Sequence, residues 1–139
     1  MADRTTVTID APIGEVWAVL ADIASWPSWT PTVSKVRALS GSPQLGADFE
    51  LEQPRLPTAV WEIAAWEPPT RFDWVSKSMG IVTEATHDLT ADGNRTVVTL
   101  AVSQSGGLAP LVRLFYRRLT RRYIATEAAS LKARCEARG

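Results

Sequence analysis

The sequence predicts an α+β fold in which a meandering antiparallel sheet packs against one long C-terminal helix. Between residues 33 and 104, short segments with alternating apolar and polar side chains follow one another. Such runs of strands between helices are typical of antiparallel sheets. Residues 111–138 then contain neither glycine nor proline. An unbroken helix of about 30 residues would be about 45 Å long. That is more than a small domain spans, so the sheet must wrap around it.

Size and composition favour one soluble domain over residues 1–139. The 139 residues carry 15 basic and 15 acidic side chains, and a net charge near zero gives no reason to expect nucleic acid as a partner. The single cysteine, Cys135, suits a reducing compartment. Residues 1–6 lack the apolar core of a signal peptide, and no run approaches the length of a membrane span. We therefore expect a cytoplasmic protein with no integral membrane association.

Near the N-terminus, the pattern predicts one strand and two short helices. Residues 5–10 alternate as in a half-buried strand. A helix then begins at Ala11-Pro12, where proline is tolerated in the first turn. Residues 22–29 form a second helical piece that is cut by Pro27, and Pro31 ends it.

Six further strands are predicted before the last helix. Their alternating segments are residues 33–39, 47–53, 58–67, 71–77, 81–91 and 96–104. A bulge is expected just before Trp66, because it would return this side chain to the face that carries Trp61. Asp92-Gly93-Asn94 is a hairpin signal between the last two strands.

The last helix follows the glycine pair Gly106-Gly107 and has Pro110 in its first turn. Its apolar residues recur at helical spacing, but the stripe moves around the axis near Thr120. Basic residues are frequent in its first half, namely Arg113, Arg117, Arg118, Arg121 and Arg122. They could attract an anionic lipid or an acyl-carrier protein, although a solvated helix face is the commoner role of such a run. Glu127 could point toward the sheet, and we assign it no catalytic role.

The only histidine, His87, is predicted to face inward. In residues 81–91, Glu84 and Asp88 occupy one face, and His87 shares the other with apolar residues. An inward imidazole could act as a general acid or base, or donate a hydrogen bond to a ligand carbonyl group. The more frequent alternative is a half-buried histidine that is hydrogen-bonded to a neighbour.

Six tryptophans in so short a chain indicate an aromatic interior. Such side chains could line a pocket for a flat apolar ligand, or they could simply fill the core. The candidate ligand-binding residues are Phe49, Trp61, Trp66, Phe72, Trp74, Met79, Ile81, His87, Phe115 and Leu119. No glycine loop for phosphate and no CxxC or HExxH pattern is present. We therefore expect no cofactor and no metal.

The order of several short motifs resembles the polyketide cyclase/dehydrase-like branch of the START-related (SRPBCC, helix-grip) superfamily. The residues that carry the resemblance are Ile9-Asp10-Ala11-Pro12, Glu15-Val16-Trp17, Leu20-Ala21-Asp22, Trp26-Pro27, Trp29, Pro31, residues 67–72, Thr86-His87-Asp88-Leu89, Leu131-Lys132 and Glu136. The resemblance spans nearly the whole chain. It implies a curved sheet around the C-terminal helix with an apolar cavity between them, and it implies no single reaction.

Three functions follow as hypotheses. The first is binding of a small hydrophobic molecule, aromatic, polyketide-like or lipid-like, in the cavity. The second is a polyketide cyclase or dehydratase in which His87 moves a proton and the cavity selects the productive conformer. The third is a non-catalytic protein–protein interaction module, homodimeric in one form, which would expose an apolar patch.

Overall fold

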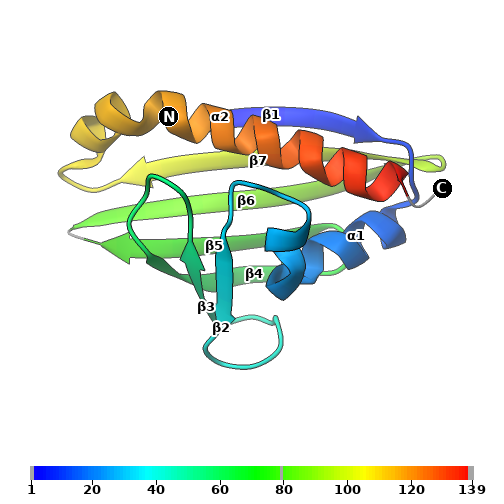
Figure 1. The fold of residues 1–139 in the computed structure, drawn as a ribbon, viewed down its shortest axis with the longest axis horizontal. Coiled ribbons are helices and arrows are strands. Elements are labelled where there is room, and N and C mark those ends of the chain that lie inside the picture. The colour runs from blue at the N-terminus through cyan, green and yellow to red at the C-terminus, as the bar shows by residue number, and fades with distance from the viewer. Residues whose placement is uncertain (1, 79, 138–139) are drawn as a thin grey trace.

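The computed structural model describes residues 2–78 and 80–137, and this part of the chain forms one seven-stranded sheet and three helical segments. The elements are β1 (Ala2–Ile9), α1 (Ile13–Ala21), the 3-10 helix η1 (Ile23–Ser28), β2 (Lys35–Ala38), β3 (Asp48–Glu52), β4 (Ala59–Glu67), β5 (Arg71–Ser78), β6 (Ile81–Asp92), β7 (Arg95–Ser105) and α2 (Ala109–Glu136). The strand order is β1-β7-β6-β5-β4-β3-β2, and every neighbouring pair is antiparallel. The predicted α+β fold is confirmed (Figure 1).

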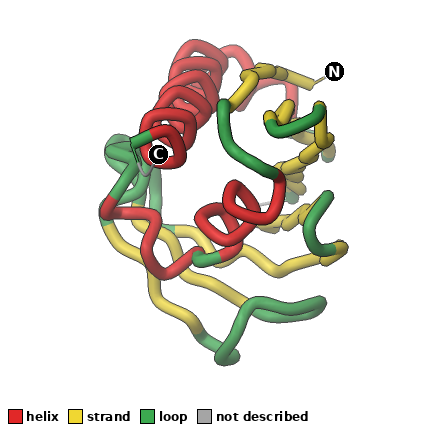
Figure 2. Tube along the Cα trace, turned by 90° about the vertical axis from the view of Figure 1, so that its right-hand side faces the viewer, coloured by secondary structure: helices red, strands yellow, loops and turns green. Residues whose placement is uncertain are grey.

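The sheet curves, and the helices lie on its concave side. Along the axis of α2, the strands bend around the interior of the molecule (Figure 2). Helix α2 contacts β1 and β7, while α1 contacts α2, β6 and β7. None of the helices in the described residues has the combination of length and apolar character that crossing a membrane requires.

Strand β1 begins three residues earlier than the alternation predicts. Ala2 pairs with Ser103 and Ile9 pairs with Thr96, so β7 extends the strand to the start of the described chain. Pro12 is the N-cap of α1 rather than its first helical residue. Such boundaries depend on pairing and capping partners, which local patterns do not contain.

The predicted bulge in β4 is confirmed. Ile63 lies opposite Trp74, but Trp66 lies opposite Phe72, because the register shifts between Ile63 and Ala65. Since directly opposed residues share a face of the sheet, the shift returns Trp66 to the concave face. There its ring lies 5.1 Å from the ring of Trp17, between centroids.

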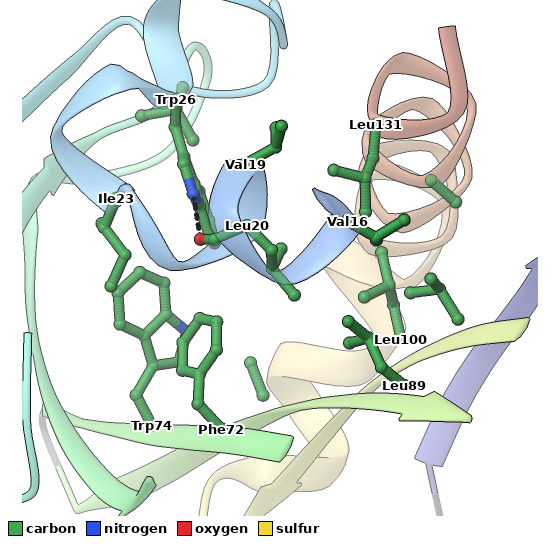
Figure 3. Packing of buried hydrophobic residues seen from close by; sticks show 14 of the residues in the cluster. Val16, Val19, Leu20, Ile23, Trp26, Phe72, Trp74, Leu89, Leu100 and Leu131 are labelled. Carbon is green, nitrogen blue, oxygen red and sulfur yellow. Dashed lines mark hydrogen bonds between the residues drawn. The ribbon is translucent and has the colours of Figure 1, made fainter. Parts of the chain in front are cut away.

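Much of the concave face is filled by aromatic side chains from the sheet and from η1. Trp26 is 1% exposed, and its indole N–H donates to the Leu20 carbonyl oxygen at 2.9 Å (Figure 3). Its ring centroid lies 5.3 Å from that of Trp74 and 6.2 Å from that of Phe72. The predicted second helical piece therefore brings a tryptophan into the core.

Polar contacts hold both ends of α2 against β1. Near its start, Arg113, Arg117 and Arg121 lie 4.0, 3.7 and 3.1 Å from Asp3 Oδ1, as expected for residues one turn apart on one helix face. Near its end, Lys132 Nζ donates to the Thr8 carbonyl oxygen at 2.8 Å. These contacts set the position of α2 over the sheet, and with it the side chains that α2 presents to the interior.

Candidate functional site

A cavity of about 100 Å³ lies between α2 and the concave face of the sheet. Its apolar wall includes Trp26, Leu51, Trp61, Trp74, Leu100 and Ile124. The polar residues of its lining are Gln53, Thr86, His87, Thr120, Tyr123 and Glu127. A water molecule needs about 10–15 Å³ and pockets for drug-sized ligands have about 300–1,000 Å³. The cavity therefore has room for a small ring or for one end of a larger molecule.

Three of the predicted ligand-binding residues, Trp61, Trp74 and His87, line this cavity. Phe49 and Phe72 are buried one layer behind the wall, with ring centroids 6.3 and 5.4 Å from that of Trp74. The aromatic residues thus do both things that the sequence left open, because some fill the core and some line the remaining cavity.

Of the other five predicted residues, four lie elsewhere and one lies outside the described residues. Trp66 packs against Trp17 and Phe72, and Ile81 pairs with Ser78 at the start of β6. Phe115 is 73% exposed and lines a separate depression with Leu119. The apolar stripe of the first half of α2 faces away from the sheet, which is why these two side chains lie outside. Met79 lies outside the described residues.

His87 is buried and held in one orientation. It is 4% exposed, and its ring stacks on that of Phe72 with centroids 4.0 Å apart and an angle of 8° between planes. The predicted inward orientation is confirmed. Its Nδ1 lies 3.0 Å from the Phe72 carbonyl oxygen. Because a carbonyl oxygen only accepts, Nδ1 carries the proton and Nε2 of the neutral ring keeps a lone pair.

The polar partner of His87 comes from α2. Glu127 Oε1 lies 3.9 Å from His87 Nε2, and the Glu127 side chain is 12% exposed. Oε1 is buried and has no hydrogen-bond partner among the described residues. The sequence predicts that Glu127 could point toward the sheet but not that it meets His87, since only the rotation of α2 places it opposite β6. The one available signal was the shift of the apolar stripe near Thr120.

Burial moves the pKa values of these two groups in opposite directions. Desolvation lowers the pKa of His87 to about 4, although the Phe72 carbonyl and the Asp73 carboxylate both oppose this change. Desolvation raises the pKa of Glu127 to about 7. Both shifts favour the uncharged form. Near neutral pH, the pair therefore consists of a neutral imidazole and a carboxyl group that keeps its proton to a higher pH than an exposed glutamate does.

Trp61 contributes a third polar atom. Its indole N–H is buried and has no hydrogen-bond partner among the described residues. The residues that line the cavity thus include an N–H donor, a carboxyl group and an imidazole lone pair on a mostly apolar wall. Such a set can hold a carbonyl or hydroxyl oxygen, and it can move a proton. The described residues contain no group of three or more metal-ligating side chains.

Comparison with solved structures shows the same fold in several proteins. The Zhui aromatase/cyclase from Streptomyces sp. R1128 superposes with a TM-score of 0.82 at 18% identity, over 99% of this chain and 94% of that chain. A START superfamily protein from Mycobacterium smegmatis gives 0.76 at 17% identity, over 99% of both chains. A protein from Thermus thermophilus gives 0.79 at 16% identity, over 100% of this chain and 99% of that one.

At these identities, the structural matches show the fold and not a shared activity. A sequence comparison with curated proteins found no match. The family model for polyketide cyclase/dehydrase and lipid transport proteins matches residues 4–136. This match covers almost the whole chain and includes every element from β1 to α2. The chain therefore belongs to the polyketide cyclase/dehydrase and lipid transport family.

Proposed function

We propose that the protein binds a small, mainly apolar molecule that carries a ring and a carbonyl or hydroxyl group. The observation that supports this is that two residues of the cavity wall, Trp61 and Glu127, each have a buried polar atom, Nε1 and Oε1, without a hydrogen-bond partner among the described residues. A buried polar group without a partner costs about 1–3 kcal/mol. A ligand oxygen between these atoms would remove that cost, while the aromatic wall would bind the ring.

The size of the cavity restricts the ligand. About 100 Å³ suits a single ring or a short chain. A longer polyketide-like or lipid-like ligand would extend past Leu56 and Tyr123, two half-buried residues of the wall. Tyr123 donates a hydrogen bond to the Pro54 carbonyl oxygen, which links α2 to the loop between β3 and β4. This link would have to open for a larger molecule.

A matched pair of tryptophan variants tests the binding proposal. Native mass spectrometry of freshly purified protein would first identify a bound small molecule and its stoichiometry. Trp61→Phe would then remove an N–H at the cavity, and Trp66→Phe would remove one away from it. We expect Trp61→Phe to weaken binding of that molecule by about tenfold, equivalent to about 1.4 kcal/mol. Equal effects of the two variants, or no binding at all, would contradict the proposal.

A second candidate function is acid–base catalysis by the same residues. His87 Nε2 and Glu127 Oε1 are 3.9 Å apart, one as a neutral base and one as an acid. His87 could remove a proton from the carbon beside a ketone, while Glu127 gives its proton to a β-hydroxyl group. The hydroxyl leaves as water and a C=C bond forms. Proton transfer from His87 back to Glu127 would restore both groups.

This second function agrees with the dehydrase part of the family description. It predicts that His87→Ala and Glu127→Gln keep most of the affinity for a β-hydroxyketone but lose its dehydration. Under the binding function alone, wild-type protein would bind such a compound without converting it.

A homodimer and a cytoplasmic location stay predictions. The molecular mass from size-exclusion chromatography at two protein concentrations tests whether the protein forms a homodimer.

A further inference from the structure

The first half of α2 exposes an apolar face to solvent. Leu111, Leu114 and Phe115 are 51, 77 and 73% exposed. Their spacing of three and four residues places them on one side of the helix, which differs from the side that packs on the sheet. Leu108, just before the helix, is 48% exposed. Large apolar side chains that gather on one exposed face indicate an interaction surface.

The same face is basic. Residues 93–126 contain no aspartate and no glutamate. Three arginines of α2 point to Asp3, but Arg118 and Arg122 continue the spacing of the exposed apolar residues, seven and eleven positions after Leu111. Neither of them forms an ion pair with another described residue. Both line a shallow depression together with Arg55, Phe115 and Leu119.

We propose that this face, made of Leu111, Leu114, Phe115, Arg118 and Arg122, docks on an anionic lipid bilayer. Leucine and phenylalanine side chains on a surface helix insert into the boundary between headgroups and acyl chains. Arginines beside them reach the phosphate level, where their charge attracts anionic lipid. A second copy of this chain fits poorly, because a symmetric dimer through this face would bring Arg118 and Arg122 against their own copies.

The docking face lies next to the wall of the internal cavity. The depression and the internal cavity are built from neighbouring residues of the same segments, with Arg55 beside Leu56, Leu119 beside Thr120, and Arg122 beside Tyr123. Docking would thus bring the partly exposed side of the cavity wall to the membrane surface. An apolar ligand could then enter from the bilayer without crossing bulk water. The docking itself does not depend on the proposed ligand binding.

Vesicle co-sedimentation tests the docking face. The full chain is mixed with vesicles of phosphatidylcholine alone, or of phosphatidylcholine with phosphatidylglycerol, at low and high salt. We expect binding to the anionic vesicles only, and weaker binding at high salt. Arg118→Gln with Arg122→Gln should reduce the partition coefficient about tenfold or more. Lys77→Gln with Arg134→Gln removes the same charge from exposed sites elsewhere and should have a much smaller effect.

A second matched pair tests the apolar part. Leu114→Ser and Leu45→Ser alter leucines that are 77% and 68% exposed, so neither should unfold the protein. We expect only Leu114→Ser to weaken vesicle binding. The proposal is overturned if anionic vesicles are not bound, or if both control variants act as strongly as the test variants. It is also overturned if the wild type is a stable dimer that Leu114→Ser dissociates, or if it binds polyglutamate but no vesicles.

Discussion

The two halves of α2 belong to one continuous helix but contribute to the molecule in different ways. In the second half, Ile124, Ala128, Leu131 and Cys135 are 7, 3, 0 and 3% exposed. In the first half, Leu111, Leu114 and Phe115 face the solvent, and ion pairs to Asp3 hold the helix to β1. Figure 1 shows the first turns of α2 at the end of the molecule away from α1. The helix is therefore continuous over both halves, although only its second half is buried against the sheet.

The difference comes from the rotation of the apolar stripe around the helix axis. At about 100° per residue, residues 124, 128, 131 and 135 lie on one side, and residues 111, 114 and 115 lie on another. Only the first set can meet the sheet, because a straight helix presents one side to it. Glu127 lies at the edge of the buried side, which is how it reaches His87.

The largest contrast between the two halves is expected for leucine truncation. Leu131 is fully buried, so Leu131→Ala should lower the free energy of unfolding by about 3 kcal/mol. Leu114 is 77% exposed, so Leu114→Ala should change it by less than about 0.5 kcal/mol. Denaturant titration of both variants measures this. Similar losses in the two variants would show that the first half of α2 is also packed.

Glu127 should make stability depend on pH. Its folded pKa of about 7 lies above the ordinary value of 4.5, so its contribution to stability is present below pH 4.5 and is lost as the pH rises through 7. Glu127→Gln removes this loss and should stabilise the protein by about 2 kcal/mol at pH 8.5, and by little at pH 4.5. Thermal denaturation across this range measures the difference. A stability gain that does not vary with pH would contradict the assignment.

His87 has the opposite effect, which gives a control for Glu127. Its pKa falls from 6.5 to about 4, so its contribution is present above pH 6.5 and is lost as the pH falls toward 4. Burial lowers this pKa, the Phe72 carbonyl and Asp73 oppose that change, and Glu127 lies 3.9 Å from the ring. In Glu127→Gln this acid-side loss of stability should remain. If the acid-side loss of stability disappeared in this variant, His87 and Glu127 would titrate as one coupled pair.

The start of α2 depends on one glycine. Gly106 has φ +111°, and a Cβ there would lie 2.1 Å from the Gly80 carbonyl oxygen. Gly106→Ala should therefore cost about 2 kcal/mol, because backbone must move. The neighbouring Gly107 has open space around its Cα, so Gly107→Ala should cost little. Equal unfolding midpoints for the two variants would contradict the close approach of Gly106 to Gly80 before the first half of α2.

The smallest effect is expected at Asp3. Its side chain is 5% exposed and faces three arginines that are 17, 45 and 57% exposed. Asp3→Asn should lower the free energy of unfolding by about 1 kcal/mol, because solvent screens much of each pair. Hydrogen exchange should rise in the first half of α2 and not in the second. Uniform exchange along α2 would mean that Asp3 does not hold the first half.

Local patterns were sufficient for the fold and for part of the site. The order of the strands, the bulge before Trp66 and the inward face of His87 follow from alternation and from glycine and proline positions, which act over a few residues. The cavity residues Trp61 and Trp74 follow in the same way. Phe115 is a predicted ligand-binding residue but is 73% exposed, and helical spacing alone does not say which side of a helix meets a sheet.

The sequence by itself determined the type and order of the elements, because hydrophobic period, proline and glycine act locally. Only the tertiary structure decided that Glu127 meets His87, that a cavity of about 100 Å³ remains among the tryptophans, and that the apolar side of the first half of α2 is exposed. Each of these depends on how α2 is rotated and positioned over the sheet. Contacts between segments far apart in the chain set that geometry, such as Asp3 with Arg121 and Thr8 with Lys132.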